Sequence, residues 1–226
     1  MDQGFKSYWA EFLGTFTLCL AGQGAICVAQ MTGAGPSALL GIAVAHGLAL
    51  AVMISALGST SGAHFNPAVT FGFLVTGKQK LPSAIAYWAS QLLGAVLASL
   101  LLRTVMPEAV WRAVHLGAPV IAPEISVGAA VVIEFMMTFF LVTVVWGTAV
   151  DDRAPRIGGF GIGLTVTMDI LFGGPLTGAA MNPARAFGAA QFGEAMQNHW
   201  VWWAGPMLGG ASAALVYDRL ILKKKN

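Results

Sequence analysis

Two short segments of this apolar chain carry the same triplet of side chains: Asn66-Pro67-Ala68 and Asn182-Pro183-Ala184. Asparagine is a favourable N-cap, and proline at the first helical position has its φ angle preset, so each triplet predicts the start of a helix. Only residues 69–77 and 185–192 remain before the next loop, and these are too few to cross a bilayer. We therefore expect two half-helices, whose capping amides can also donate a hydrogen bond to a water molecule.

Ionisable side chains lie within segments that are otherwise apolar, among them Glu11, Glu134, Asp169 and Arg185. Such a charge costs at least ~2.5 kcal/mol to insert into a membrane, so each is a candidate functional group. For Glu11 and Glu134 we favour carboxylates that support a loop by accepting backbone N–H groups over a proton relay. For Asp169, a bond to a loop, a bond to a neighbouring subunit and a charge that tunes a pore stay open. Arg185 follows the second triplet, where the first has Val69, and we expect a functional guanidinium.

Apolar residues make up 57% of the chain and charged residues only 10%, which is typical of a protein that is solvated by lipid. A helix needs ~20 apolar residues to cross the hydrocarbon layer. The abundant glycine and alanine predict close packing between such helices. Segments of suitable length predict six membrane-spanning helices, over residues 9–29, 38–57, 81–104, 126–149, 157–172 and 200–222.

The two halves of the chain repeat one another in three places. The matching segments, taken in order, are 10–18 with 133–141, 61–72 with 177–188, and 87–95 with 202–210. Each half has three predicted spans, an odd number, so the second half must enter the bilayer in the opposite sense. We interpret the chain as a single membrane channel domain, 1–226, with a first repeat, a connecting loop and a second repeat at 1–104, 105–125 and 126–226.

An inverted repeat places its site near the membrane midplane, where the positive N-terminal ends of the two half-helices meet. Non-helical backbone is tolerated at that depth only when it is buried in protein or lines a wet cavity. The segments before the two triplets therefore predict backbone carbonyls that face a pore, from Gly62, Ala63, His64, Phe65, Gly178, Ala180 and Met181.

Most lysines and arginines fall on one side of the six-span arrangement, and the positive-inside rule then places both termini of this integral, multi-pass protein in the cytoplasm. The net charge of +2 reflects this topology, with no basic stripe that would suit nucleic acid, so the expected partner is the lipid bilayer. The short termini favour a prokaryotic plasma (inner) membrane over a plant vacuole.

The paired triplets, the glutamates of the first and fourth spans, and the segment HWVWWAGPMLGG at 199–210 together resemble the aquaporin, or major intrinsic protein, family across essentially the whole chain. The resemblance implies an all-α membrane protein with six transmembrane helices and two half-helices in an inverted three-span repeat. It also implies a homotetramer without a cofactor, in which each subunit conducts water passively through its own pore and excludes protons and ions.

Aligned through the triplets, the resemblance places a selectivity filter at His46, Ile170, Ala179 and Arg185. This set is similar to the filters of plant tonoplast-type members, some of which also pass ammonia or urea. Strict water channels typically have an aromatic residue at the position of His46 and histidine at that of Ile170, so ammonia or another small neutral solute is a further candidate. Ala186 follows the arginine where glycerol facilitators usually have aspartate, which disfavours glycerol.

Two other histidines have open roles. His64 either lines the pore or bonds to nearby backbone, and His115 in the connecting loop is a candidate for the pore mouth. An ion-coupled secondary transporter of a small neutral solute is the alternative function, since such transporters also use inverted repeats and broken helices. We expect neither an enzyme nor a metal site, because no metal-ligand cluster and no paired acid and base converge on one place.

Overall fold

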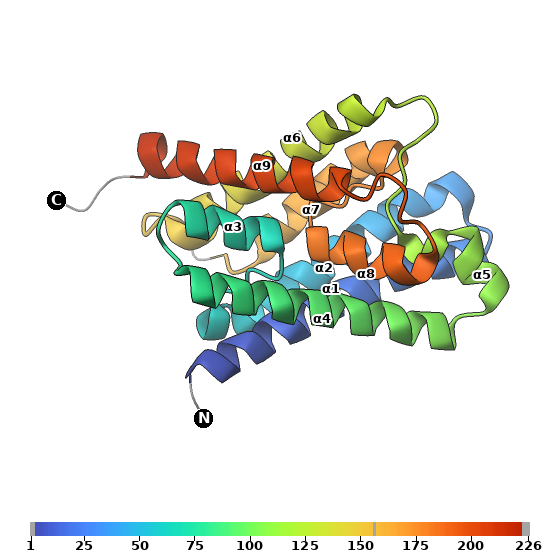
Figure 1. Cartoon of the computed structure of the whole chain (residues 1–226), viewed down its shortest axis with the longest axis horizontal. Helices are drawn as coiled ribbons and strands as arrows, with labels where there is room; N and C mark the ends of the chain where they lie inside the picture. Colours follow the sequence, from blue (N-terminus) through green and yellow to red (C-terminus); the bar gives the residue numbers. More distant parts are fainter. Residues whose placement is uncertain (1–2, 156, 223–226) are drawn as a thin grey trace.

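The computed structural model describes residues 3–155 and 157–222, and every element in this part of the chain is a helix. The long helices lie side by side as a bundle (Figure 1). In chain order the α-helices are α1 (Gln3–Met31), α2 (Ala38–Ser61), α3 (Pro67–Val75), α4 (Leu81–Val105), α5 (Glu108–Ala113), α6 (Val127–Val145), α7 (Phe160–Thr177), α8 (Pro183–Gly193) and α9 (Val201–Val216). The start of α1 and the end of α9 lie at the same end of the bundle, as an even number of crossings requires (Figure 1).

Five helical segments of the described chain are long and apolar enough to cross a membrane: Gly4–Met31, Gly35–Ser61, Leu81–Val105, Val127–Val150 and Phe160–Thr177. Helix α9 has only 16 residues, but the π-helical segment Tyr217–Ile221 continues it. These two elements together occupy the place of the sixth predicted span, 200–222.

The fifth span lies further toward the C-terminus than the sequence predicts. We expected it to end at Phe172, before Gly173, Gly174 and Pro175, but α7 continues through this proline to Thr177. Membrane helices tolerate glycine and proline where neighbouring elements satisfy the backbone. Here Gly173 also permits close packing, since a side chain at this position would overlap that of Met137 on α6.

Each half-helix packs against the opposite half of the chain, α3 against α9 and α8 against α4. Glycines make this approach possible. A Cβ atom at Gly72 would meet Ala214 and the Gly210 carbonyl at 3.1 and 3.4 Å, and one at Gly188 would overlap the backbone of Ala95. Since small residues allow membrane helices to approach closely, the two repeats interlock around the half-helices.

The outward faces of the long helices carry large apolar side chains. Leu40 and Val52 on α2 are 60% and 61% exposed, and Leu164 on α7 is 52% exposed. A soluble monomer rarely exposes so continuous an apolar surface, whereas hydrocarbon solvates it without cost. The interior is therefore left for the polar groups that the following subsection describes.

Polar contacts join the ends of α6 and α9. The Asp151 carboxylate accepts hydrogen bonds from Nε of Arg153 at 2.9 Å and from the Tyr217 hydroxyl at 3.3 Å. The hydrogen-bonded Arg153 guanidinium holds the pKa of Asp151 well below its usual range. Lys78, beyond the end of α3, forms an ion pair with Asp218 at 2.7 Å. These contacts fix the end of the bundle at which α1 begins.

Candidate pore

Both half-helices begin at the asparagine of a triplet, as the sequence predicts. The Asn66 side chain accepts a hydrogen bond from the backbone N–H of Ala68 at 2.8 Å. The Asn182 side chain does the same for the N–H groups of Ala184 at 3.1 Å and Arg185 at 3.3 Å. Each Oδ1 atom is therefore committed to its own helix, which leaves the amide hydrogens for other partners.

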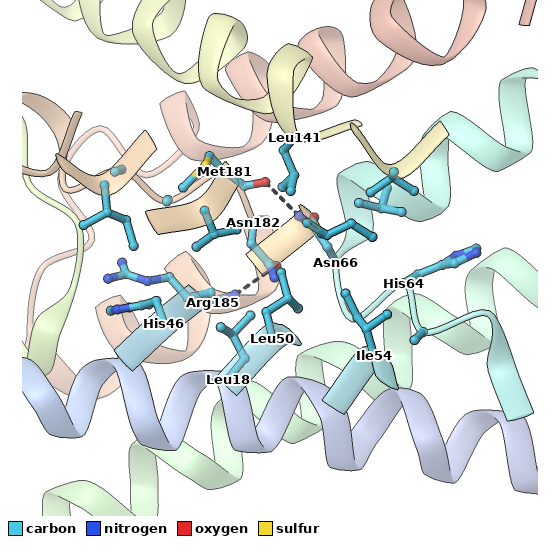
Figure 2. Close-up of a pocket in the computed structure, with 18 residues that line it drawn as sticks. Leu18, His46, Leu50, Ile54, His64, Asn66, Leu141, Met181, Asn182 and Arg185 are labelled. Carbon is cyan, nitrogen blue, oxygen red and sulfur yellow. Dashed lines mark hydrogen bonds between the residues drawn. The ribbon is translucent and has the colours of Figure 1, made fainter. Parts of the chain in front are cut away.

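The two amides bond across to the opposite repeat. Nδ2 of Asn66 donates to the Met181 carbonyl at 2.9 Å, and Nδ2 of Asn182 donates to the Phe65 carbonyl at 2.8 Å. Figure 2 shows Asn66 and Asn182 side by side, with the bond to Met181 drawn as a dashed line. An amide has two hydrogens, so one hydrogen of each asparagine is left for a molecule in the cavity between them.

The backbone before each triplet adopts an unusual conformation in matched positions. Ala63 and Phe65 have φ values of 51° and 50°, and Ala179 and Met181 have values of 43° and 51°. Left-handed backbone is unfavourable for residues with a Cβ atom and persists only where surrounding groups hold it. The two segments therefore depend on support from the helices around them.

Glu11 and Glu134 contact these segments directly. The Glu11 carboxylate accepts the backbone N–H groups of His64 at 2.9 Å and Phe65 at 2.7 Å. The Glu134 carboxylate accepts those of Ala180 at 3.0 Å and Met181 at 2.8 Å. Both glutamates are fully buried. These contacts have the geometry of the supporting role that we favour from the sequence.

Further supports were not foreseen from the sequence. The Tyr87 hydroxyl donates to the Ser61 carbonyl at 2.7 Å, and Nε1 of Trp202 donates to the Thr177 carbonyl at 3.0 Å. Tyr87 and Trp202 are equivalent in the repeat, so the alignment of the two halves contained the signal that could have identified them. Gln91 breaks the symmetry, because its Nε2 atom donates to Glu11 at 2.7 Å and its counterpart in the second repeat is a proline.

One cavity joins both half-helices, and most of the residues predicted to face the pore line it. Figure 2 shows His46 and Arg185 at one end, the two asparagines in the middle and His64 at the other end. Apolar side chains such as Leu18 and Leu50 form the remaining wall. The predicted site residues that line this cavity are His46, Ala63, His64, Asn66, Ile170, Ala179, Ala180, Met181, Asn182 and Arg185.

Three residues lie between this cavity and a second one. His46, Ile170 and Arg185 line both cavities, and the second is also bounded by the connecting loop, including Ala118 and Val120. Residues that line two cavities lie where the two meet, and we call this place the constriction. Three of the four residues that the sequence assigns to a filter therefore meet at one constriction, and Ala179 lines the first cavity only.

The constriction carries hydrogen-bonding groups of both kinds. Nε and Nη1 of Arg185 are buried donors that have no hydrogen-bond partner within residues 3–155 and 157–222. Nδ1 of His46 lies 2.9 Å from the Ile42 carbonyl, which can only accept, so Nδ1 carries a hydrogen. In the neutral ring Nε2 is then an acceptor, and it too has no partner in the described part of the chain. A small molecule that both donates and accepts suits these groups.

The comparisons with known proteins identify the family. The model of the family described as "Major intrinsic protein" matches residues 2–217. The chain belongs to the major intrinsic protein family. It is 42% identical to "Aquaporin TIP1-2" of Zea mays, over 97% of this chain and 87% of the relative. It is 40% identical to "Lens fiber major intrinsic protein" of Lithobates pipiens, over 97% and 82% of the two chains.

The fold agrees as well. The X-ray structure of the aquaglyceroporin from Plasmodium falciparum matches with a TM-score of 0.85 and 26% identity, over 96% of this chain and 97% of that one. Membership of the major intrinsic protein family confirms the predicted integral, multi-pass membrane protein. It also confirms a channel rather than an enzyme.

Some predicted residues of this major intrinsic protein lie apart from the cavity lining. Gly62 and Phe65 do not line it, and Gly178 borders the second cavity instead. Phe65 places its ring against α1, where a side chain at Gly14 would overlap it. The Phe65 carbonyl, which we predicted to face the pore, accepts the amide of Asn182. The prediction assumed that every backbone carbonyl before a triplet faces the pore. The φ angles change sign along these segments, so successive carbonyls point in different directions.

His115 and Asp169 also line neither of these two cavities. His115 contacts the Gly193 carbonyl through Nδ1 at 3.2 Å and borders a separate surface cavity with Glu194. Asp169 is 2% exposed, and its Oδ2 atom has no hydrogen-bond partner in the described residues. Its neighbour Ile170 faces the constriction. Adjacent positions on a helix face different directions, so Asp169 points elsewhere.

His64 lines the cavity, and the groups that fix its ring are side chains rather than the nearby backbone that the sequence offered as the alternative. It lines the first cavity at the end opposite the constriction. Its Nδ1 atom lies 3.1 Å from the Thr70 hydroxyl, and its ring stacks on Phe73 with centroids 4.2 Å apart. The histidine therefore belongs to the wall of the cavity and is also fixed by neighbours on α3.

Proposed function

We propose that this protein is a passive water channel that excludes protons and ions. The observation that carries the proposal is the pair of asparagines at the middle of the cavity, each with one amide hydrogen left over from its bond to the opposite repeat. A water molecule between Asn66 and Asn182 can accept from both amides. Its own hydrogens then point away from the centre, toward either end of the cavity.

This orientation separates water transport from proton transport. A proton moves along a chain of waters only where each water can both accept and donate in the same direction. A central water that accepts twice interrupts such a chain. The N-terminal ends of α3 and α8 meet at the same place, and each carries about half a positive charge, which opposes the entry of cations.

The constriction is the proposed selectivity filter. Arg185 supplies a fixed positive charge and unpaired donors, and His46 supplies the unpaired acceptor. Ile170 forms the apolar wall of the constriction, and Ala179 continues this wall in the first cavity. Selectivity in such a pore depends on its diameter, its lining groups and its electrostatic barriers. Water meets these requirements, and ammonia, a neutral molecule that also donates and accepts, is the second solute that we propose.

Osmotic water permeability in proteoliposomes tests the function. We expect purified protein to raise water permeability above that of empty liposomes, with a low activation energy and with no proton flux in a pH-dye assay on the same vesicles. Flux that required a sodium or proton gradient would instead identify the ion-coupled transporter, an alternative that the family does not favour. Proton flux that rose in proportion to water flux would contradict the proposed exclusion.

Ile170→His tests the apolar wall of the filter. The imidazole is larger and polar, so we expect it to narrow the constriction and to reduce ammonia or urea permeability more than water permeability. The measurement is the ratio of solute to water permeability at equal protein density. Ile170→Leu, which conserves volume and polarity, is the control and should keep the wild-type ratio. An unchanged ratio in Ile170→His would show that residue 170 does not line the filter.

We also propose an assembly and a membrane orientation. The homotetramer and the cytoplasmic position of both termini follow from the family resemblance and the distribution of positive charge. The relatives compared above come from a plant and an animal, so they give no support to a prokaryotic plasma membrane.

A further inference from the structure

Gly22 on α1 faces the imidazole of His46. A Cβ atom at Gly22 would overlap the ring, and the three nearest atoms that it would meet are Nε2, Cδ2 and Cε1 of His46. His46 is only 4% exposed, and the first cavity borders it on another side. The imidazole thus occupies a notch in α1 that exists because residue 22 has no side chain.

The His46 ring has one direction in which it can be displaced. Its Nδ1 atom is held by the Ile42 carbonyl of its own helix at 2.9 Å, and rotation away from that carbonyl would break this buried hydrogen bond. The space beside the ring is the cavity that His46 lines, with Arg185 at the same end (Figure 2). A ring pushed off α1 therefore moves into the constriction.

Some of the other tightly packed glycines have backbone atoms as neighbours instead. A side chain at Gly94 would overlap the Phe12 carbonyl, and one at Gly47 would overlap the Gly163 carbonyl. Those glycines let the backbones of two helices approach each other, which is their usual role in membranes. At Gly22 the nearest atoms belong to a single side chain of the constriction, so its role concerns His46 rather than the packing of two backbones.

We propose that Gly22 is a positioning residue for the selectivity filter: its missing side chain lets the His46 imidazole lie against α1 and so sets the width of the constriction. The inference deepens the proposed function, on which it rests. Glycine destabilises a helix relative to alanine. The space that the His46 ring needs explains why glycine nevertheless occupies position 22.

Gly22→Ala is the test. We expect the displaced ring to lower osmotic water permeability about tenfold, which corresponds to a barrier higher by ~1.4 kcal/mol. The matched control is Gly24→Ala on the same helix, where a Cβ atom would meet only Leu102 at an ordinary 3.6 Å. This control should keep wild-type permeability. In a His46→Ala background the ring is absent, so adding Gly22→Ala should change permeability less than twofold.

Thermal unfolding of the same variants gives a readout that does not depend on transport. Gly22→Ala should lower the Tm of the wild-type protein. Added to His46→Ala, the same substitution should leave the Tm unchanged or raise it. If the wild type conducts no water, the proposed function fails, and this cycle still decides whether Gly22 seats the ring.

Each possible outcome either supports or overturns the proposal. Failure of Gly22→Ala to assemble, with recovery in Gly22→Ala/His46→Ala, supports the overlap between the two residues. Failure of both variants overturns the proposal, because residue 22 would then serve helix packing. Wild-type behaviour of Gly22→Ala, or equal losses in both backgrounds, overturns it too.

Discussion

Glu11→Ala and Glu134→Ala are each expected to abolish water permeability in reconstituted protein. Each substitution leaves two buried backbone N–H groups without an acceptor, in a segment whose backbone is already left-handed. An unpaired buried donor costs ~1–3 kcal/mol, so each segment loses roughly 2–6 kcal/mol of support. Stopped-flow water permeability and Tm, measured on the same preparations, test this expectation.

An intermediate substitution and two control variants make the test of the glutamates more specific. Glutamine keeps one acceptor oxygen and replaces the other with a donor, so Glu→Gln should fall between wild type and alanine. The controls are Thr15→Val and Thr138→Val, whose buried hydroxyls donate at 2.8 Å to the backbone carbonyls of the same two glutamates. They remove a polar group one turn away and should retain permeability. Alanine variants that conduct water normally would refute the supporting role.

Arg185→Val is expected to let cations pass. The substitution copies Val69, the equivalent residue of the first repeat, and removes the fixed charge from a constriction where the arginine is 3% exposed. A unit charge 4 Å from a passing cation contributes about 4 kcal/mol of repulsion at an effective dielectric constant of about 20. Since each 1.36 kcal/mol changes a rate tenfold, cation flux should rise by at least about tenfold.

The Arg185→Val test needs two controls. One keeps the positive charge at position 185, and the other removes an arginine that lies outside the constriction. Arg185→Lys keeps the charge and should keep cations out, although it loses the planar donors. Arg103→Ala removes a guanidinium that contacts the Phe192 carbonyl at the end of α8 and is not part of either cavity wall, so it should change nothing. The measurement is sodium or proton flux under an applied potential, alongside water permeability. Continued cation exclusion by Arg185→Val would place the barrier elsewhere.

The helical framework could be predicted from the sequence because lipid imposes simple rules. A span needs a fixed length of apolar residues, and an asparagine followed by proline has a strong preference for the start of a helix. The observed starts at Pro67 and Pro183 confirm the predicted half-helices. The end of α7 was missed because local propensity marks Pro175 as a breaker, while packing within the bundle keeps the helix intact.

The candidate site could be predicted where the two repeats match, because equivalent positions of a repeat make equivalent contacts. The equivalent positions of Glu11 and Glu134 predict equivalent contacts, and both glutamates lie against the segment before a triplet. His115 shows the limit of this reasoning. It lies in the connecting loop, which has no counterpart to align with, and the structure places it against Gly193 rather than at the constriction.

The sequence by itself determined the membrane environment, the inverted repeat, the half-helices and part of the cavity lining, because each depends on composition or on spacing along one chain. Only the tertiary structure decided that each asparagine bonds to the opposite repeat, that three residues meet at the constriction and that Gly22 makes room for His46. These contacts join segments that are distant in the chain. Their geometry depends on how closely helices approach and which way side chains turn, and neither is encoded in local sequence patterns.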